Sequence, residues 1–138
     1  MRERHMQIGE VAERTSLSLR TIRYYEEVGL VRPSARTQGG FRLYTDSDVE
    51  RLVLVKRMKP LEFSLEEMRD LLEVLDALSA PDLSGSARKE LLDRLSLYRE
   101  IADSRIERLR TQLDTAESFA ADLQAHGARH TTRSGRRR

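Results

Sequence analysis

The chain has 138 residues, of which 38% are hydrophobic and 35% are charged, a length that suits one compact domain plus one extended element. Aromatic residues make up 5% and tryptophan is absent, a composition that favours long, solvent-washed helices. There is no cysteine, which excludes disulfides, thiolate metal sites and cysteine nucleophiles. No apolar run approaches a membrane span, and no nucleophile-base pair or phosphate-cradling loop predicts an enzyme. We expect no cofactor, and the three scattered histidines predict no metal site.

The first predicted helix begins near residue 7, after a polar leader of residues 1–6 that lacks the apolar core of a signal peptide. Ile8, Val11 and Ala12 recur at helical spacing and form its buried face. Residues 15–18, which are polar except for Leu17, then interrupt the helix. This break predicts a tight turn into a second short helix.

The second helix is expected to run from a cap at Ser18 to about Val28, with Gly29 closing it. Ile22 and Tyr25 continue the apolar face. The opposite face carries Arg20, Thr21, Arg23 and Tyr24. Guanidinium, hydroxyl and phenol groups in the first turns suit a recognition helix in the major groove of DNA.

A small hairpin is predicted after the second helix. The Gly39-Gly40 pair can supply the positive-φ turn of a hairpin. The alternation that follows is expected to place Phe41 and Leu43 inward, with Arg42 and Tyr44 outward toward the DNA backbone. The other reading of this pair is a surface arginine beside a half-buried tyrosine.

Two further helices are predicted from capping boxes, in which Thr45 pairs with Asp48 and Ser64 pairs with Glu67. The third helix has an expected inner stripe of Val49, Leu52, Val53 and Val55. The fourth has an expected apolar face of Met68, Leu71, Leu72 and Leu75. Lys59, near the end of the third helix, suits either contact with a phosphate or a favourable interaction with the helix dipole.

A connector of residues 79–86 leads to one long helix over residues 87–126, which Gly127 is expected to end. Its apolar seam consists of Leu91, Leu95, Tyr98, Ala102, Ile106, Leu109, Leu113, Ala116, Ala120 and Leu123. The steps alternate between four and three, with one repeated four at Ala102, which predicts a coiled coil with a stutter. A rod on the order of 60 Å is longer than a small domain can cover, so a second copy is the economical partner. The basic tail, residues 127–138, is expected to be disordered.

Several of these motifs occur together in one order. They are Ile8-Gly9-Glu10-Val11-Ala12, Arg20-Thr21-Ile22-Arg23-Tyr24-Tyr25-Glu26-Glu27, Gly29-Leu30, Gly40-Phe41-Arg42-Leu43-Tyr44 and Phe63-Ser64-Leu65-Glu66-Glu67-Met68. With them the sequence resembles the MerR family of transcription regulators over about the first half of the chain. Departures from the family pattern occur at Ser16 and at Pro60 and Glu62, around positions where relatives often have glycine.

The resemblance implies a mainly α fold, with a winged helix-turn-helix DNA-binding domain over residues 7–78 and a long dimerisation helix in an antiparallel coiled coil. Together with the basic residues of this region, it implies DNA contacts from Ser18, Arg20, Thr21, Arg23, Tyr24, Tyr25, Arg36, Arg42, Tyr44 and Lys59. The sequence alone does not fix the direction of helix pairing.

The expected function is that of a cytoplasmic, homodimeric regulator that binds an inverted repeat in double-stranded promoter DNA. The resemblance implies that such a dimer bends and untwists the promoter spacer so that RNA polymerase engages both promoter elements. A small-molecule effector stays open, with Tyr98 and Phe119 as conceivable pocket residues that more often serve in packing. The alternative is a coiled-coil adaptor that binds another protein. The operator, the target genes and the sign of regulation are not encoded in these patterns.

Overall fold

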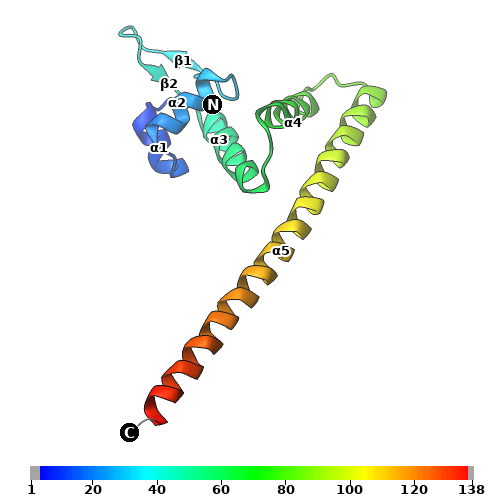
Figure 1. The fold of residues 1–138 in the computed structure, drawn as a ribbon. Helices are drawn as coiled ribbons and strands as arrows, with labels where there is room; N and C mark the ends of the chain where they lie inside the picture. The colour runs from blue at the N-terminus through cyan, green and yellow to red at the C-terminus, as the bar shows by residue number, and fades with distance from the viewer. Residues whose placement is uncertain (1–3, 137–138) are drawn as a thin grey trace. The chain divides into compact units, whose positions relative to one another are not determined.

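The fold of this computed structural model is mainly helical, as predicted, and the structure describes residues 4–136, with side chains through residue 131. The elements in chain order are α1 (Ile8–Thr15), α2 (Leu19–Glu27), β1 (Ala35–Arg36), β2 (Arg42–Leu43), α3 (Asp46–Met58), the 3-10 helix η1 (Lys59–Leu61), α4 (Leu65–Leu78) and α5 (Gly85–Arg136) (Figure 1). The chain divides into two compact units, one ending at Tyr98 and the other beginning at Arg99. No helix in the described part of the chain is both long and apolar enough to cross a membrane.

Helices α2, α3 and α4 begin where side-chain caps are available, which confirms their predicted starts. The Ser18 hydroxyl accepts a hydrogen bond from the backbone N–H of Thr21 at 3.0 Å. Thr45 with Asp48, and Ser64 with Glu67, form complete capping boxes at the starts of α3 and α4. Each cap satisfies backbone donors that a helix start otherwise leaves unpaired.

The core of the first unit is built by one face from each of α1 to α4 together with the segment after α2. Its fully buried apolar side chains include Val11, Ile22, Leu30, Val31, Leu52, Val55, Leu72 and Val74. Val53, expected on the inner stripe of α3, is 37% exposed instead. The helix start at Thr45 directs Leu52 and Val55 inward, and Val53 lies about 100° around the helix from Leu52.

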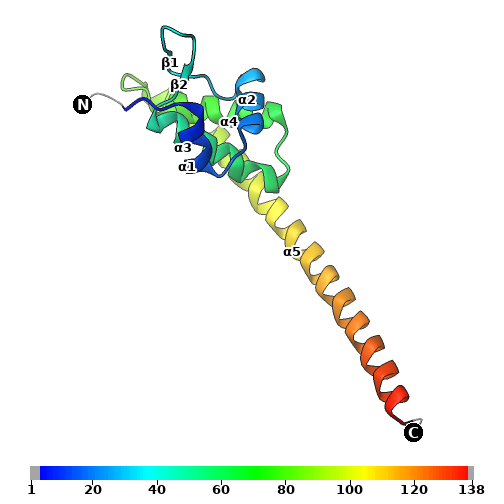
Figure 2. The same ribbon diagram turned by 90° about the vertical axis from the view of Figure 1, so that its left-hand side faces the viewer.

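The end of the predicted leader belongs to the folded unit. Met6 is buried, and its backbone exchanges two hydrogen bonds of 2.8 Å with Tyr44. Arg4 forms an ion pair with Glu10 of α1 at 2.9 Å. Residues 1–3 of the leader lie outside the described residues. The backbone of Met6 thus extends the small β1–β2 sheet, whose hairpin projects from the helices of this unit (Figure 2).

The predicted end of the long helix at Gly127 is wrong. Helix α5 begins at Gly85, two residues before the predicted start, and continues through Gly127 to Arg136. A glycine inside an exposed helix costs about 1 kcal/mol relative to alanine, which a long cooperative helix tolerates. The first part of the tail expected to be disordered is therefore helical, and residues 137 and 138 lie outside the described residues.

Within residues 4–136, two non-glycine residues adopt the left-handed conformation, and both mark departures from the family pattern. Ser16, which ends α1, has φ 57°, and Glu62, which ends η1, has φ 59°. Left-handed backbone brings Cβ close to the following carbonyl oxygen, which costs about 1–2 kcal/mol in a residue other than glycine. Both turns therefore carry backbone strain that a glycine would remove.

We predict that Ser16→Gly raises the free energy of unfolding by about 0.5–1 kcal/mol, because relief of strain exceeds the added entropy of the unfolded chain. Urea unfolding followed by circular dichroism, at one fixed protein concentration, measures the change. Ser96→Gly, at an exposed helical position of α5, is the matched control and should lower stability by about 0.5 kcal/mol. Destabilisation by both substitutions would contradict strain at Ser16.

Candidate nucleic-acid interface

Helix α2 presents its predicted polar face to solvent. Arg20, Arg23 and Tyr24 are exposed, while Ile22 and Tyr25 on the other face are buried. Thr21 is half-buried, and its hydroxyl lies 2.8 Å from that of Ser18. The cap therefore places two hydroxyls and an arginine in the first turn, at the end of the helix whose free N–H groups favour anions.

A hollow of about 470 Å³ lies beside α2 and brings five predicted DNA-binding residues together. It is lined by Arg20, Thr21, Tyr24, Tyr25, Lys59, Phe63, Leu65 and Met68. Burial raises the pKa of Tyr25, and the electrostatic effect of the neighbouring Tyr24 raises it further, so the Tyr25 phenol stays protonated. The two cations and the hydroxyl groups favour an anionic group at this place, such as a phosphate.

The wing is a short antiparallel hairpin in which Ala35 pairs with Leu43 and Arg36 pairs with Arg42. Its turn contains Gly40 at φ +83°, as the Gly39-Gly40 motif predicts. The expected alternation is wrong, however, because Phe41 is 66% exposed and Tyr44 is fully buried. Phe41 belongs to the turn, where the alternation of a strand does not yet hold, and its backbone N–H bonds the Thr37 hydroxyl at 3.0 Å.

The carboxylate of Glu26 joins α2 to the wing. Its Oε1 accepts a hydrogen bond from Nε of Arg42 at 2.7 Å, and its Oε2 accepts one from the Tyr44 hydroxyl at 2.9 Å. The guanidinium of Arg36 lies 3.7 Å away as a second ion-pair partner. The Glu26 side chain is only 13% exposed. The recognition helix and the wing therefore share one largely buried anion.

Two of the wing residues predicted to contact DNA are affected by this carboxylate. Tyr44 does not point outward, because its ring fills the core and its hydroxyl donates to Glu26. Burial and then the Glu26 hydrogen bond raise the pKa of Tyr44 strongly, so the hydroxyl remains a donor. Arg42 keeps part of its surface accessible, and the hydrogen bond to Glu26 raises its pKa. Tyr44 thus supports the wing, whereas Arg42 lies on its surface.

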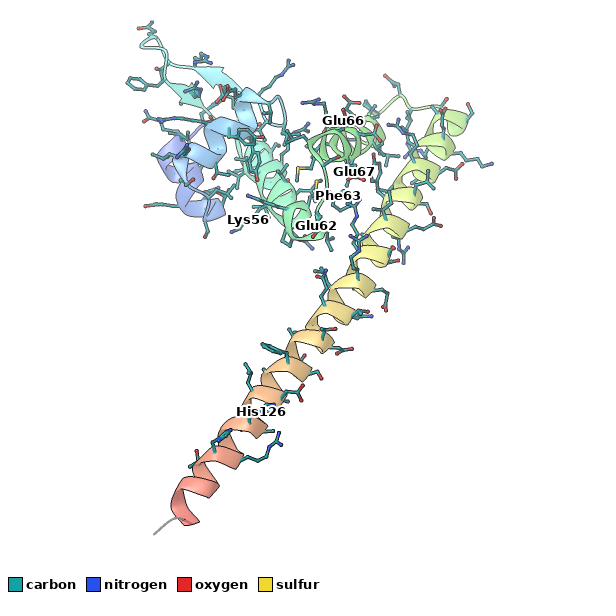
Figure 3. The ribbon with its side chains drawn as sticks, viewed as in Figure 1. Lys56, Glu62, Phe63, Glu66, Glu67 and His126 are labelled. Atoms are coloured by element: carbon teal, nitrogen blue, oxygen red, sulfur yellow. The ribbon has the colours of Figure 1, made fainter. Side chains whose placement is uncertain are left out.

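Other cations in the first unit hold backbone carbonyls and position the interface. Lys56 donates to the carbonyl of Thr15 at the end of α1 at 2.9 Å (Figure 3). Arg69 of α4 donates to the carbonyl of Val28, and Arg51 of α3 donates to that of Leu30. These contacts fix the segment that leads from α2 to the wing. Arg51 also pairs with Asp76.

The predicted dimerisation residues fall into two groups. Leu91, Leu95 and Tyr98 are half-buried within the first unit, and Tyr98 contacts Phe63 and Asp70 rather than lying free. Ala102 and Ile106 are half-buried, and the remaining members Leu109, Leu113, Ala116, Ala120 and Leu123 are exposed. Phe119, considered as a pocket residue, is 62% exposed. The exposed part of the seam therefore begins at Leu109.

Sequence reasoning missed Glu26 and Phe41 as members of the interface. A glutamate in the last turn of a recognition helix carries no signal of its own, because its partners lie 16 and 18 residues further along the chain. Phe41 was assigned inward by alternation alone. Its position beside two glycines was the available signal for a turn, where an aromatic side chain can stand free.

The short helix pair α1–α2, the exposed cationic face of α2 and the small wing define the class of winged helix-turn-helix DNA-binding proteins. Residues 6–75 match the model of the MerR HTH family regulatory protein. The chain is 36% identical over 123 residues to the HTH-type transcriptional regulator YfmP of Bacillus subtilis, covering 86% of this chain and 88% of YfmP. It belongs to the MerR family of transcriptional regulators, which favours DNA binding over the adaptor alternative.

Further relatives agree with this assignment. The HTH-type transcriptional regulator ZntR of Escherichia coli is 46% identical over 67 residues, which cover 49% of this chain and 48% of ZntR. HiNmlR, a MerR family regulator lacking the sensor domain and solved bound to promoter DNA, has the same fold with a TM-score of 0.68. That likeness covers 91% of this chain and 94% of HiNmlR at 24% identity.

We predict that Glu26→Ala lowers the free energy of unfolding by about 1–3 kcal/mol, because the buried Tyr44 hydroxyl loses its acceptor. Tyr44→Phe removes that donor. In the Tyr44→Phe background, Glu26→Ala should therefore lower the free energy of unfolding by less than it does in the unmodified protein. The neighbouring exposed Glu27→Ala is the control and should change stability by less than about 0.5 kcal/mol. Urea unfolding of these three variants and of the Glu26→Ala, Tyr44→Phe double variant measures the differences. Equal effects at positions 26 and 27 would contradict the role of the Glu26 carboxylate.

Proposed function

We propose that this chain acts as a homodimer that binds an inverted repeat in promoter DNA and alters transcription of the adjoining gene. The observation that carries the proposal is the exposed polar face of α2 beside the hollow that contains Arg20 and Lys59. Family membership supplies the class of function, and this surface supplies the contacts. Promoter DNA of a bacterial chromosome places such a protein in the cytoplasm.

Helix α2 supplies the base-reading side chains in this proposal. The major groove admits one helix, and arginine pairs with guanine through two hydrogen bonds. Arg20, Arg23 and Tyr24 have the exposure that such contacts need. Ser18 and Thr21, at the capped helix start, are suited to a neighbouring phosphate.

Contacts to the DNA backbone come from the wing and from η1. Arg36, Arg42 and Phe41 lie on the accessible surface of the hairpin, and Lys59 with Tyr25 lines the hollow beside α2. Phosphate contacts fix the register of the protein on the duplex without reading its sequence. Tyr44 is left out of this set because its hydroxyl is taken by Glu26.

Dimerisation uses the exposed part of α5. Leu109, Leu113 and Leu123 expose 38%, 58% and 56% of their surface in the single chain, and a second copy is the partner that covers such a stripe with two-fold symmetry. Two recognition helices related by a two-fold axis match the two halves of an inverted repeat. HiNmlR, which resembles this chain in fold, is a regulator lacking the sensor domain and bound to promoter DNA.

The regulatory step in this proposal is deformation of the promoter. A dimer that bends and untwists the spacer between the promoter elements changes how RNA polymerase fits them, and the sequence-dependent cost of that deformation contributes to specificity. A lead(II) complex is known for the related PbrR691. The absence of cysteine excludes thiolate ligands in this chain, so an effector would have to be recognised by other chemistry.

We predict that Arg20→Ala and Arg23→Ala each weaken specific operator binding about tenfold to a hundredfold, because each removes a base or phosphate contact. Electrophoretic mobility shift over a salt series measures affinity and slope. Loss of a phosphate contact should also reduce the slope of log affinity against log salt by about 1. Arg99→Ala, exposed on α5, is the control and should leave both quantities unchanged. Undiminished operator preference in both α2 variants would contradict the recognition-helix assignment.

We predict that Leu109→Glu combined with Leu113→Glu dissociates the dimer at low micromolar concentration, since charges would enter the apolar seam. Analytical ultracentrifugation measures the mass, and inverted-repeat binding should be lost with the dimer. Thr111→Glu introduces the same charge on the opposite face of α5 and should leave the dimer intact. A double variant that remains dimeric would show that the seam is misassigned.

A further inference from the structure

One carboxylate joins the start of α5 to α4. Oδ2 of Asp70 on α4 accepts a hydrogen bond from the Tyr98 hydroxyl at 2.5 Å, and Oδ1 forms an ion pair with Arg94. The Tyr98 ring packs against Phe63, which precedes α4, with the ring centroids 6.2 Å apart and a tilt of 41°. We call Phe63, Asp70, Arg94 and Tyr98 the Asp70 junction.

The geometry of the junction restrains α5 in more than one direction. Arg94 and Tyr98 lie one turn apart on α5, so their two hydrogen bonds converge on a single carboxylate from points separated by about 6 Å along the helix. Sliding of α5 along α4, or rotation about its own axis, would break at least one of them. The aromatic contact with the buried Phe63 adds a third point of attachment.

The Tyr98 hydroxyl is held in the form that this arrangement needs. Burial, and then the hydrogen bond to Asp70, raise the pKa of Tyr98 to about 12. The phenol therefore remains a donor across the whole physiological range. The Asp70 and Arg94 side chains are 37% and 40% exposed, so the junction lies near the surface and contributes through geometry more than through stability.

We propose that the Asp70 junction is a positioning device that determines which half-site spacing the dimer accepts. This inference rests on the proposed function. Helix α4 packs in the unit that contains the recognition helix, and α5 continues from the junction as one helix into the exposed seam. Dimer contacts on α5 are therefore connected to the recognition helices through the Asp70 junction as well as through the connector of residues 79–84. A looser junction lets the two recognition helices adapt to altered separations.

The first test compares binding to the selected operator with binding to versions in which the half-sites are one or two base pairs closer or farther apart. Tyr98→Phe keeps the ring and removes the hydroxyl, while Asp70→Asn keeps the size but leaves one acceptor oxygen for two donors. Each should reduce discrimination against altered spacings about five- to tenfold. Affinity for a single half-site and the dimer dissociation constant should stay unchanged. Glu73→Gln, an exposed charge loss on the same helix, is the control.

A DNA-independent measurement separates failure of this inference from failure of the proposed function. Because the chain has no cysteine, Glu13→Cys and Ser104→Cys accept spin labels at two defined positions, and excess unlabelled chain restricts the signal to distances within one protomer. Both junction variants should broaden the distance distribution, and Glu73→Gln should not. Unchanged widths, or affinity lost equally at all spacings, would overturn the inference. Absence of inverted-repeat binding by the unmodified protein would contradict the proposed function. The widths of the distance distributions would then still show whether the Asp70 junction restrains α5.

Discussion

The arrangement of α2 and the wing depends on the carboxylate of Glu26, because this one side chain bonds to both Arg42 and Tyr44. A hairpin with two-residue strands forms few ladder hydrogen bonds and is marginal on its own. Glu26 attaches it to α2 through Arg42 and the buried Tyr44, and the backbone of Met6 pairs with the far side of Tyr44. The distance between the recognition helix and the wing is therefore set by side-chain chemistry rather than by a sheet.

Some cations of the first unit bind the backbone of the protein itself, whereas others are exposed on α2. Lys56, Arg51 and Arg69 donate to backbone carbonyls at the ends of α1 and α2 and in the following segment. These side chains stabilise the fold, because each donates a hydrogen bond to a carbonyl that a helix end or loop would otherwise leave unpaired. Arg20 and Arg23 are exposed on α2. A basic composition alone does not distinguish cations that donate to backbone carbonyls from the exposed arginines of α2.

Features that depend on residues close together in the chain could be predicted from the sequence, and features that depend on distant residues could not. Caps at Ser18, Thr45 and Ser64 involve residues three apart, so the helix starts were predictable. The burial of Tyr44 was not, because its acceptor lies on another element, and two-residue strands are too short for alternation to fix which side faces the core. Gly127 suggested a helix end that the length of α5 overrides. The orientation of Tyr44 depends on a distant partner and the end of α5 on the length of the helix, whereas Phe41 was misassigned although the neighbouring glycines signalled a turn.

The apolar stripe of α5 shows this limit most clearly. Its periodicity is nearly uniform from Leu91 to Leu123, yet Tyr98 binds Asp70 of the same chain whereas Leu113 is exposed. The repeated four-residue step at Ala102 follows directly after Tyr98, and the boundary between the two compact units falls there as well. An inserted step of four locally changes the direction in which a heptad stripe faces. The stutter therefore lies between the part of the stripe that contacts α4 of the same chain and the part that is exposed from Leu109 onward.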